Sequence, residues 1–159
     1  MEKRTALFVD DEEKILRALK RGLREEPYNT LFTKSGHEAL EILRQNEVHV
    51  LVTDMRMPEM SGLELFEIVK KEYPDTVIMA LSGQPQVQQA EISALVKAFN
   101  QGEIFKIIAK PWDLEEVLKI AVRQAIDYYD LHNERDSLAT ELEQCKAKLG
   151  EEMPPESGE

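Results

Sequence analysis

The sequence predicts an α/β protein in which helices cover both faces of a parallel β-sheet, a doubly wound arrangement. Five short apolar runs alternate with five segments in which apolar residues recur at three- and four-residue spacing. The runs are apolar at nearly consecutive positions, which is typical of strands buried on both faces. Strands and helices that alternate in this way form parallel sheets, and 159 residues are enough for one such domain.

The predicted elements follow one another without long gaps. Strands are expected over residues 5–9, 29–33, 48–53, 76–81 and 104–109. Helices are expected around residues 15–23 and 36–43 and over residues 62–73, 86–102 and 113–149. Ser35 stands three residues before Glu38 in a capping-box pattern, and Pro74 ends the third helix.

The composition limits the kinds of partner and of compartment. The net charge of −11 opposes direct binding to nucleic acid, whose phosphates are met by lysine and arginine. No apolar run reaches the length of a membrane-spanning helix, so we expect no membrane insertion. The single cysteine, Cys145, excludes an internal disulfide and fits the reducing cytoplasm, where we expect the protein to reside.

Polar side chains follow four of the five predicted strands. The residues directly after these strands are Asp10 and Asp11, Asp54, Ser82 and Gly83, and Lys110 and Pro111. The carboxyl ends of parallel strands lie along one edge of a sheet, so we expect these side chains to share one crevice. Three converging carboxylates repel one another unless a cation is present. Mg²⁺ suits such a site, because it prefers hard oxygen ligands completed by water.

Each of these residues has a simpler interpretation when it is taken alone. Asp10 or Asp11 would serve as an ordinary cap of the first helix. Ser82 would be a turn residue, and Lys110 would be a solvated lysine before a proline. Their occurrence together along one edge of the sheet favours a functional site.

Four segments of the chain resemble the response-regulator receiver domain of bacterial two-component signalling. They read LFVDDEE, VTDMRMPEMSGLEL, IMALSGQ and IIAKPWD, and they occur in the family's order between about Arg4 and Ala125. The resemblance implies a flavodoxin-like sheet of five parallel strands in the order 2-1-3-4-5, with five helices of which the last is extended. It also implies a signalling switch and not an enzyme with a separate small-molecule substrate.

By this resemblance Asp54 is the phosphoacceptor. A sensor histidine kinase or a phosphotransfer protein would donate the phosphoryl group, and the carboxylate would attack it as a nucleophile. Mg²⁺ would neutralise charge on the transferring group. Its ligands would be Asp10, Asp11, Asp54 and the backbone carbonyl of Arg56. Phosphorylation is then expected to change the conformation or the partner binding of the chain.

Further residues match the family's site by position. Lys110 would contact the phosphoryl oxygens, and Ser82 would donate its hydroxyl to them after transfer. Gly83 would leave room for the phosphoryl group, and Gln84 would tune the lifetime of the acyl phosphate. The peptide bond before Pro111 is expected to be cis, as in this family.

One position departs from the family's pattern. Receivers carry Tyr or Phe three residues before the lysine as a rotating switch side chain, and this chain has Ile107 there. The usual coupling between movement of Ser82 and an aromatic flip is therefore in question. The segment GEIFKIIAKPWD resembles a receiver subgroup that is joined to cyclic-dinucleotide phosphodiesterase or other output domains.

The three histidines lie outside these motifs. Structural roles are expected for His37, His49 and His132. His49 is a polar residue within the third apolar run, and we expect it to face outward at an edge of a packed helix.

The chain is expected to divide into a receiver domain over residues 1–126, an extended helix over 127–149 and a disordered acidic tail or linker over 150–159. Apolar residues of the extended helix recur at alternating spacings, and they are Tyr128, Leu131, Leu138, Leu142, Cys145 and Leu149. The pattern predicts a short dimerising coiled coil, and a solvated helical overhang also fits it. The chain fits either a stand-alone receiver or a segment of a longer protein.

Three functions are compatible with these residues. The first is a phosphorylation switch, with a homodimer formed through the face of the fourth helix, fifth strand and fifth helix or through the C-terminal helix. The second is a Mg²⁺-dependent aspartyl phosphohydrolase. Such enzymes carry a nucleophile after the first strand and a second acid two residues later, whereas Asp10 and Asp11 are adjacent. The third is a degenerate receiver that acts as a protein-binding scaffold, which the full set of acids and Lys110 disfavours.

Overall fold

Strands and helices alternate throughout the residues that the computed structural model describes, which are 3–82, 89–110 and 114–152. The strands are β1 (Thr5–Val9), β2 (Asn29–Thr33), β3 (Val50–Asp54), β4 (Val77–Ser82) and β5 (Lys106–Ala109). The helices are α1 (Glu13–Gly22), α2 (Gly36–Gln45), α3 (Gly62–Glu72), α4 (Gln89–Asn100) and α5 (Leu114–Glu152). Each element that the apolar periodicity predicted is present.

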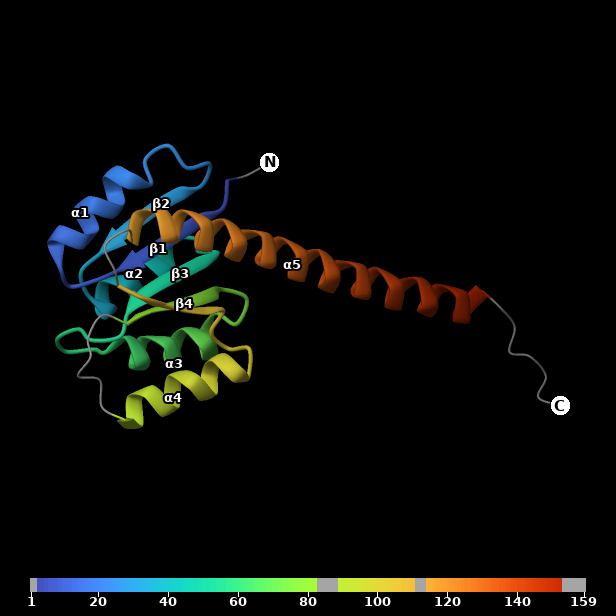
Figure 1. The fold of residues 1–159 in the computed structure, drawn as a ribbon. Helices are drawn as coiled ribbons and strands as arrows, with labels where there is room; N and C mark the ends of the chain where they lie inside the picture. Colours follow the sequence, from blue (N-terminus) through green and yellow to red (C-terminus); the bar gives the residue numbers. More distant parts are fainter. Residues whose placement is uncertain (1–2, 83–88, 111–113, 153–159) are drawn as a thin grey trace. The chain divides into compact units, whose positions relative to one another are not determined.

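The strands form one parallel sheet in the order β2-β1-β3-β4-β5, which confirms the expected fold class and strand order (Figure 1). β1 lies between β2 and β3, and it pairs Phe8 with Phe32 on one side and with Val52 on the other. The rings of Phe8 and Phe32 stack with their centroids 5.3 Å apart. Because β1 and β3 are interior neighbours, the residues at their carboxyl ends meet in the middle of the sheet edge.

Side chains that alternate along the interior strands fill two separate cores, one on each face of the sheet. In β1, Ala6 and Phe8 join one core, whereas Leu7 and Val9 join the other. Helices α1 and α5 complete the first core, mainly with Leu19, Leu118, Ala121, Val122 and Ala125. Helices α2, α3 and α4 complete the second, mainly with Ala39, Leu43, Leu65, Phe66 and Leu95. Burial on both faces explains why the strand sequences are apolar at consecutive positions.

Two strands begin later than their apolar runs. The third run starts at Val48 but β3 begins at Val50, and β5 begins at Lys106 although its run starts at Ile104. The backbone N–H of Ile104 donates to the carbonyl of Ala98 at 3.3 Å, so this residue closes the end of α4 and does not extend the sheet. An apolar run alone does not distinguish these two ways of being buried.

His49 faces inward, so the expectation that it faces outward is wrong. The residue is 4% exposed, and its Nδ1 accepts a hydrogen bond of 3.0 Å from the backbone N–H of Thr5. The imidazole ring meets the ring of Tyr129 edge-on, with a centroid distance of 4.9 Å. His49 therefore satisfies the first N–H group of β1 and packs against α5, which is a structural role.

The chain divides into two compact units, residues 1–129 and residues 130–159. The first unit contains the whole sheet and both cores. The second contains the C-terminal part of α5, and nearly all of its side chains from Leu131 to Leu149 are exposed. Within the described ranges, no helix combines the length and the apolarity that crossing a membrane requires.

The loop after β3 returns onto that strand at Gly62, the first residue of α3. A Cβ atom at Gly62 would lie 2.0 Å from the carbonyl oxygen of Asp54. The N–H of Gly62 donates to the carbonyl of Met55 at 3.1 Å, and the Ser61 hydroxyl caps the helix by accepting from the N–H of Glu64 at 3.1 Å. The close approach of two backbones, and not a left-handed conformation, therefore requires glycine at position 62.

We expect Gly62→Ala to lower the free energy of unfolding by roughly 2–3 kcal/mol, because the added methyl group must displace the backbone of Asp54. Gly102→Ala is the matched control. Gly102 has φ +75°, but no atom lies within 4 Å of an added Cβ. Only backbone strain of about 1 kcal/mol is therefore expected there. Urea denaturation of both variants gives the comparison, and equal losses would contradict the collision at Gly62.

Candidate functional site

Asp10 is positioned directly after β1, at the centre of the sheet edge. Its backbone N–H donates to the carbonyl of Thr33 at 3.1 Å, which continues the pairing of β1 with β2. Its Oδ1 accepts a hydrogen bond of 2.9 Å from the backbone N–H of Glu12, and the residue is 1% exposed. The cap residue of α1 is Glu12, so neither Asp10 nor Asp11 fills the simpler role of helix cap. The N–H of Glu12 instead orients a buried carboxylate.

Asp54 is the last residue of β3 and is also buried. It pairs in register with Leu81 of β4, and its Oδ1 accepts a hydrogen bond of 3.4 Å from the backbone N–H of Arg56. The approach of Gly62 to its carbonyl oxygen fixes the backbone from the other side. The N–H of Arg56 and the backbone at Gly62 thus hold Asp54 in place at the sheet edge.

Lys110 brings the fifth strand into the same cluster. Its Nζ lies 2.8 Å from Oδ2 of Asp10 and 3.2 Å from Oδ2 of Asp54. A third carboxylate oxygen, Oε1 of Glu12, lies at 3.8 Å. The backbone N–H of Lys110 donates to the carbonyl of Ser82 at 2.9 Å, which continues the ladder between β4 and β5 and sets where the side chain starts. One ammonium group therefore forms ion pairs with two buried carboxylates.

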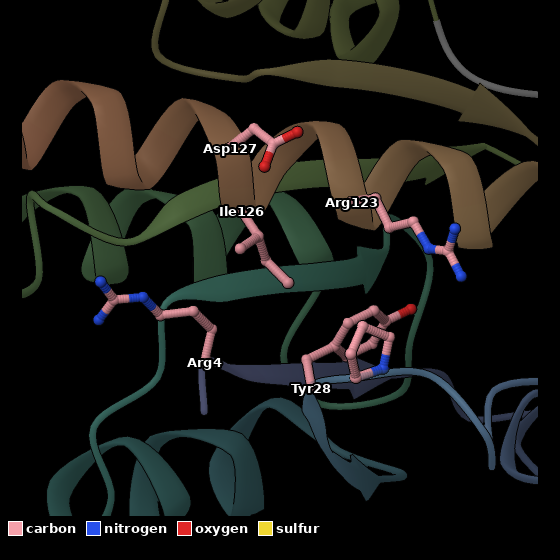
Figure 2. Close-up of a pocket in the computed structure, with 6 residues that line it drawn as sticks. Arg4, Tyr28, Arg123, Ile126 and Asp127 are labelled. Carbon is pink, nitrogen blue, oxygen red and sulfur yellow. The ribbon is translucent and has the colours of Figure 1, made fainter. Parts of the chain in front are cut away.

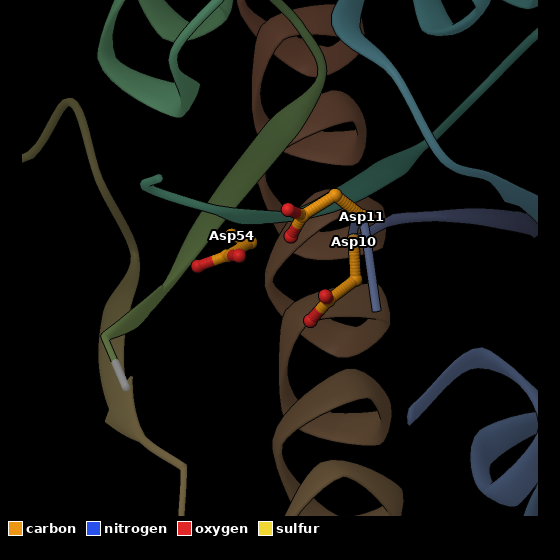
Figure 3. Close-up of side chains that lie close together, drawn as sticks. All are labelled: Asp10, Asp11 and Asp54. Carbon is orange, nitrogen blue, oxygen red and sulfur yellow. The ribbon is translucent and has the colours of Figure 1, made fainter. Parts of the chain in front are cut away.

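Asp11 completes a group of three acids that fits a hard cation. One carboxylate oxygen from each of Asp10, Asp11 and Asp54 lies within 4.8 Å of the other two, and Figure 3 shows the three side chains close together. Although Lys110 is close, Oδ2 of Asp10 is buried without a hydrogen bond of regular geometry, so it keeps an unused acceptor position. An all-oxygen donor set with a buried, unsatisfied carboxylate oxygen suits Mg²⁺.

The charges in the cluster do not balance, and the pKa values show this. The pKa of Asp54 is raised to about 6, mainly by burial and also by the negative charge of Asp10, against the opposing effects of Lys110 and of the Arg56 N–H. Burial disfavours the charged form of Lys110, but its contacts with Asp10 and Asp54 outweigh this and raise its pKa. The pocket therefore lacks positive charge when Asp54 is ionised.

The remaining predicted site residues lie around this cluster or outside the described residues. Ser82 is half-buried at the end of β4, one residue beyond the partner of Asp54. Ile107 lies opposite Ala80 and packs against the core formed with α2, α3 and α4. Three predicted residues, together with the peptide bond before the proline, lie outside the described residues, namely Gly83, Gln84 and Pro111.

Glu12 is a contributor that the sequence reasoning missed. Its N–H orients Asp10, and its side chain, which is 57% exposed, lies near the ammonium of Lys110. The available signal was the run of acids in VDDEE, in which a third acid follows the two predicted metal ligands. A backbone donor carries no residue signature, so only the folded geometry identifies its role.

A separate hollow of about 400 Å³ lies near the amino ends of β1 and β2, away from the acids (Figure 2). Figure 2 shows Arg4 and Arg123 on opposite sides of Ile126. The guanidinium of Arg123 donates to the carboxylate of Glu26 at 2.9 and 2.5 Å, so its charge is already matched. Burial raises the pKa of Tyr28, which keeps that phenol neutral. We interpret this hollow as a junction between α5 and the segment before β2.

The raised pKa of Asp54 predicts that its charge destabilises the metal-free fold. We expect Asp54→Asn to raise the free energy of unfolding at pH 7 in EDTA by on the order of 1–3 kcal/mol. Urea denaturation gives the value, and Asp11→Asn is the matched control because its side chain is exposed and should change stability less. A less stable Asp54→Asn protein would contradict this account.

The same pKa predicts a pH dependence with a definite sign. Asp54 has a folded pKa of about 6 and an ordinary value of 3.8, so between these values the folded chain binds more protons than the unfolded chain. The contribution of this group to stability is therefore complete below about pH 4 and is lost as the pH rises through 6. We expect the difference in the free energy of unfolding between Asp54→Asn and the parent protein to disappear at pH 4. A difference of the same size at pH 4 and at pH 7 would contradict the prediction.

Comparison with known proteins places this geometry in a family. The profile of the response regulator receiver domain matches residues 6–122. The chain is 34% identical over 121 residues to the transcriptional regulatory protein GlrR of Escherichia coli K12, which covers 76% of this chain and 25% of that protein. Curated relatives that match the chain are much longer, and it spans only 25–30% of their length.

Solved structures agree with this assignment. The signal receiver domain of an HD domain-containing protein from Pseudomonas fluorescens Pf-5 has a TM-score of 0.74 and 32% identity, over 85% of this chain and 95% of that chain. A response regulator from Thermotoga maritima, in complex with Mg²⁺ and BeF, has a TM-score of 0.63 and 28% identity, over 77% and 98% of the two chains. The chain belongs to the response regulator receiver domain family of two-component signalling, whose members bind Mg²⁺ at this acidic pocket and accept phosphoryl groups from histidine kinases.

Proposed function

We propose that this receiver is a phosphorylation-controlled switch whose phosphoacceptor is Asp54. The observation that carries the proposal is the placement of a buried carboxylate at the end of β3, 3.2 Å from the ammonium of Lys110 and beside Asp10 and Asp11. The phosphoryl donor would be a phosphohistidine on a sensor histidine kinase or a phosphotransfer protein. An oxygen of Asp54 would form the new P–O bond while the P–N bond to the imidazole breaks.

Mg²⁺ would be held by carboxylates of Asp10, Asp11 and Asp54 and by the backbone carbonyl of Arg56. When bound, the ion would supply charge that neutralises the transferring phosphoryl group. Support comes from the unsatisfied Oδ2 of Asp10 and from the Thermotoga relative, which was solved in complex with Mg²⁺ and BeF. The shortage of positive charge around Asp54 also favours the binding of a cation there.

The other residues would act on the phosphoryl group after transfer. Lys110, which lies between Asp10 and Asp54, would turn its ammonium toward the phosphoryl oxygens. Ser82, at the adjacent strand end, would donate its hydroxyl to them. Gln84 would tune the lifetime of the acyl phosphate, and Gly83 would leave room for the group. The cis bond before Pro111 also stays a prediction.

The signal would leave through the face made by α4, β5 and α5. Five large apolar side chains of α4 and α5 are between 38% and 61% exposed, and they are Ile92, Val96, Phe99, Val117 and Ile120. Movement of Ser82 would shift a pre-existing equilibrium of that face. Ile107 would follow this movement as a compact side chain without an aromatic flip. A homodimer through this face or through the C-terminal helix is part of the proposal.

The alternatives receive less support. A degenerate scaffold would not need a carboxylate cluster with a lysine at 2.8 and 3.2 Å from two of its members. A phosphohydrolase would need a second acid two residues after its nucleophile, and that position after Asp54 is Arg56. We therefore propose a switch without a separate small-molecule substrate. The cytoplasmic location, the absence of direct nucleic-acid binding and the three-part division 1–126, 127–149 and 150–159 stay predictions.

The phosphoacceptor is tested with a small phosphoryl donor. We expect the protein to gain the mass of one phosphoryl group when it is incubated with phosphoramidate and Mg²⁺, and to gain none when EDTA replaces Mg²⁺. Intact-mass spectrometry measures the gain. Asp54→Asn should abolish it, whereas Asp75→Asn, an exposed acid in the turn before β4, should retain it. No gain in the parent protein would favour the scaffold, and continued turnover of p-nitrophenyl phosphate would favour the phosphohydrolase.

The conformational part of the switch has its own readout. We expect beryllium fluoride with Mg²⁺ to shift backbone NMR signals of α4 and β5, because the bound group would draw Lys110 and Ser82 toward Asp54. Asp54→Asn should show no such shift under the same conditions. Shifts confined to the loops around the acids would contradict the proposed route of the signal through β5.

A further inference from the structure

The second compact unit carries an apolar stripe that no part of its own helix covers. Its leucines are exposed by 67% at Leu131, 57% at Leu138, 56% at Leu142 and 54% at Leu149. Their spacings of seven, four and seven residues place them at the two inward positions of a heptad repeat, conventionally a and d. Arg135 and Cys145 occupy the remaining a and d positions of the same stripe.

A single helix of this kind is poorly stabilised in water. Most helical stability in proteins comes from packing of an apolar face, and the exposed leucines of this unit have no packing partner among its own described residues. A heptad stripe is matched by another heptad stripe, because the side chains of each helix then fit between four residues of the other. The partner that offers the identical stripe is a second copy of this chain.

We propose that residues 130–149 of two copies form a parallel, in-register, two-stranded coiled coil. The proposal rests on the homodimer suggested above and not on phosphorylation of Asp54. It goes beyond that suggestion by naming the interface, its register and the direction of the two helices.

Charges beside the stripe favour the parallel register. Glu141 and Lys146 occupy g and e positions five residues apart, so in a parallel dimer each Glu141 lies beside the partner's Lys146. Neither residue has an ion pair within its own chain in the described part of the structure. The two Arg135 side chains would share one a layer in this register, and each would lie near Glu134 of the partner subunit, which offsets the repulsion between the two guanidinium groups.

The antiparallel arrangement would place like charges together. Leucines would still face leucines, because the stripe reads nearly the same in both directions. Glu134 would gain Lys148 of the partner subunit, but the two Glu141 side chains would face each other at the centre. Cys145 would then lie opposite Arg135 of the partner subunit, whereas the parallel register brings the two Cys145 side chains together. This difference makes the direction of the helices measurable.

The test uses the full chain with its native Cys145. We expect sedimentation equilibrium to show a dimer and a short bis-maleimide reagent to link two chains, with no link in Cys145→Ser. Leu142→Glu should weaken the dimer by about tenfold or more and abolish the link, because it places two carboxylates in the stripe. Ala147→Glu, on the outer f position, is the matched control, and it should keep both the dimer and the link through Cys145.

Two further readouts separate this inference from the proposed function. Asp54→Asn should still dimerise and still be linked through Cys145, since the interface does not use the phosphoacceptor. Leu142→Glu should still gain one phosphoryl mass, which shows that its first unit is folded. A monomeric parent chain would overturn the proposal, and so would a dimer that is not linked through Cys145 or one that Leu142→Glu leaves intact.

Discussion

The site depends on one ammonium group placed between two buried carboxylates. Lys110 stands within 3.2 Å of both Asp10 and Asp54, which come from different strands. A single positive charge holds the two acids together but does not neutralise them, and burial raises the pKa of Asp54 to about 6. This residual negative charge is a cost to the metal-free fold. The same residual negative charge makes the pocket, with Asp11 as its third acid, suitable for binding a divalent cation.

The parallel sheet is what brings these three charges to one place. The carboxyl ends of β1, β3 and β5 lie on the same edge, and the ladder between β4 and β5 continues to the N–H of Lys110. Two cores anchor the strands from both faces, so the cluster can keep unfavourable charge at the edge without loss of the fold. The approach of Gly62 to Asp54 adds a tight constraint on the backbone of that residue.

The acidic cluster is connected to β4 and β5 by backbone pairing and side-chain packing. Ser82 shares its strand with the partner of Asp54, and its carbonyl holds Lys110. The next residues in space are those of β5, where Ile107 packs against the core instead of offering an aromatic ring to rotate. A change at the acids would therefore reach α4 and α5 through small shifts of packed strands, and not through one swinging side chain.

The sequence by itself determined the doubly wound class, the order of the ten elements and, with the family resemblance, the strand order. It also located Asp10, Asp11, Asp54 and Lys110, because residues at the ends of buried strands must share one edge. Only the tertiary structure decided that His49 is buried, that Glu12 supplies the N–H that orients Asp10, and that position 62 requires glycine. Periodicity reports which residues are buried in an element, whereas these three features are contacts of the backbone with distant or specific neighbours. The bond between Thr5 and His49 joins residues 44 positions apart, so it exists only after β1 and β3 lie side by side. The approach of Gly62 to Asp54 depends on the path of the loop between them. The bond from Glu12 to Asp10 is local, but periodicity does not report it, because every residue type except proline has the same backbone N–H.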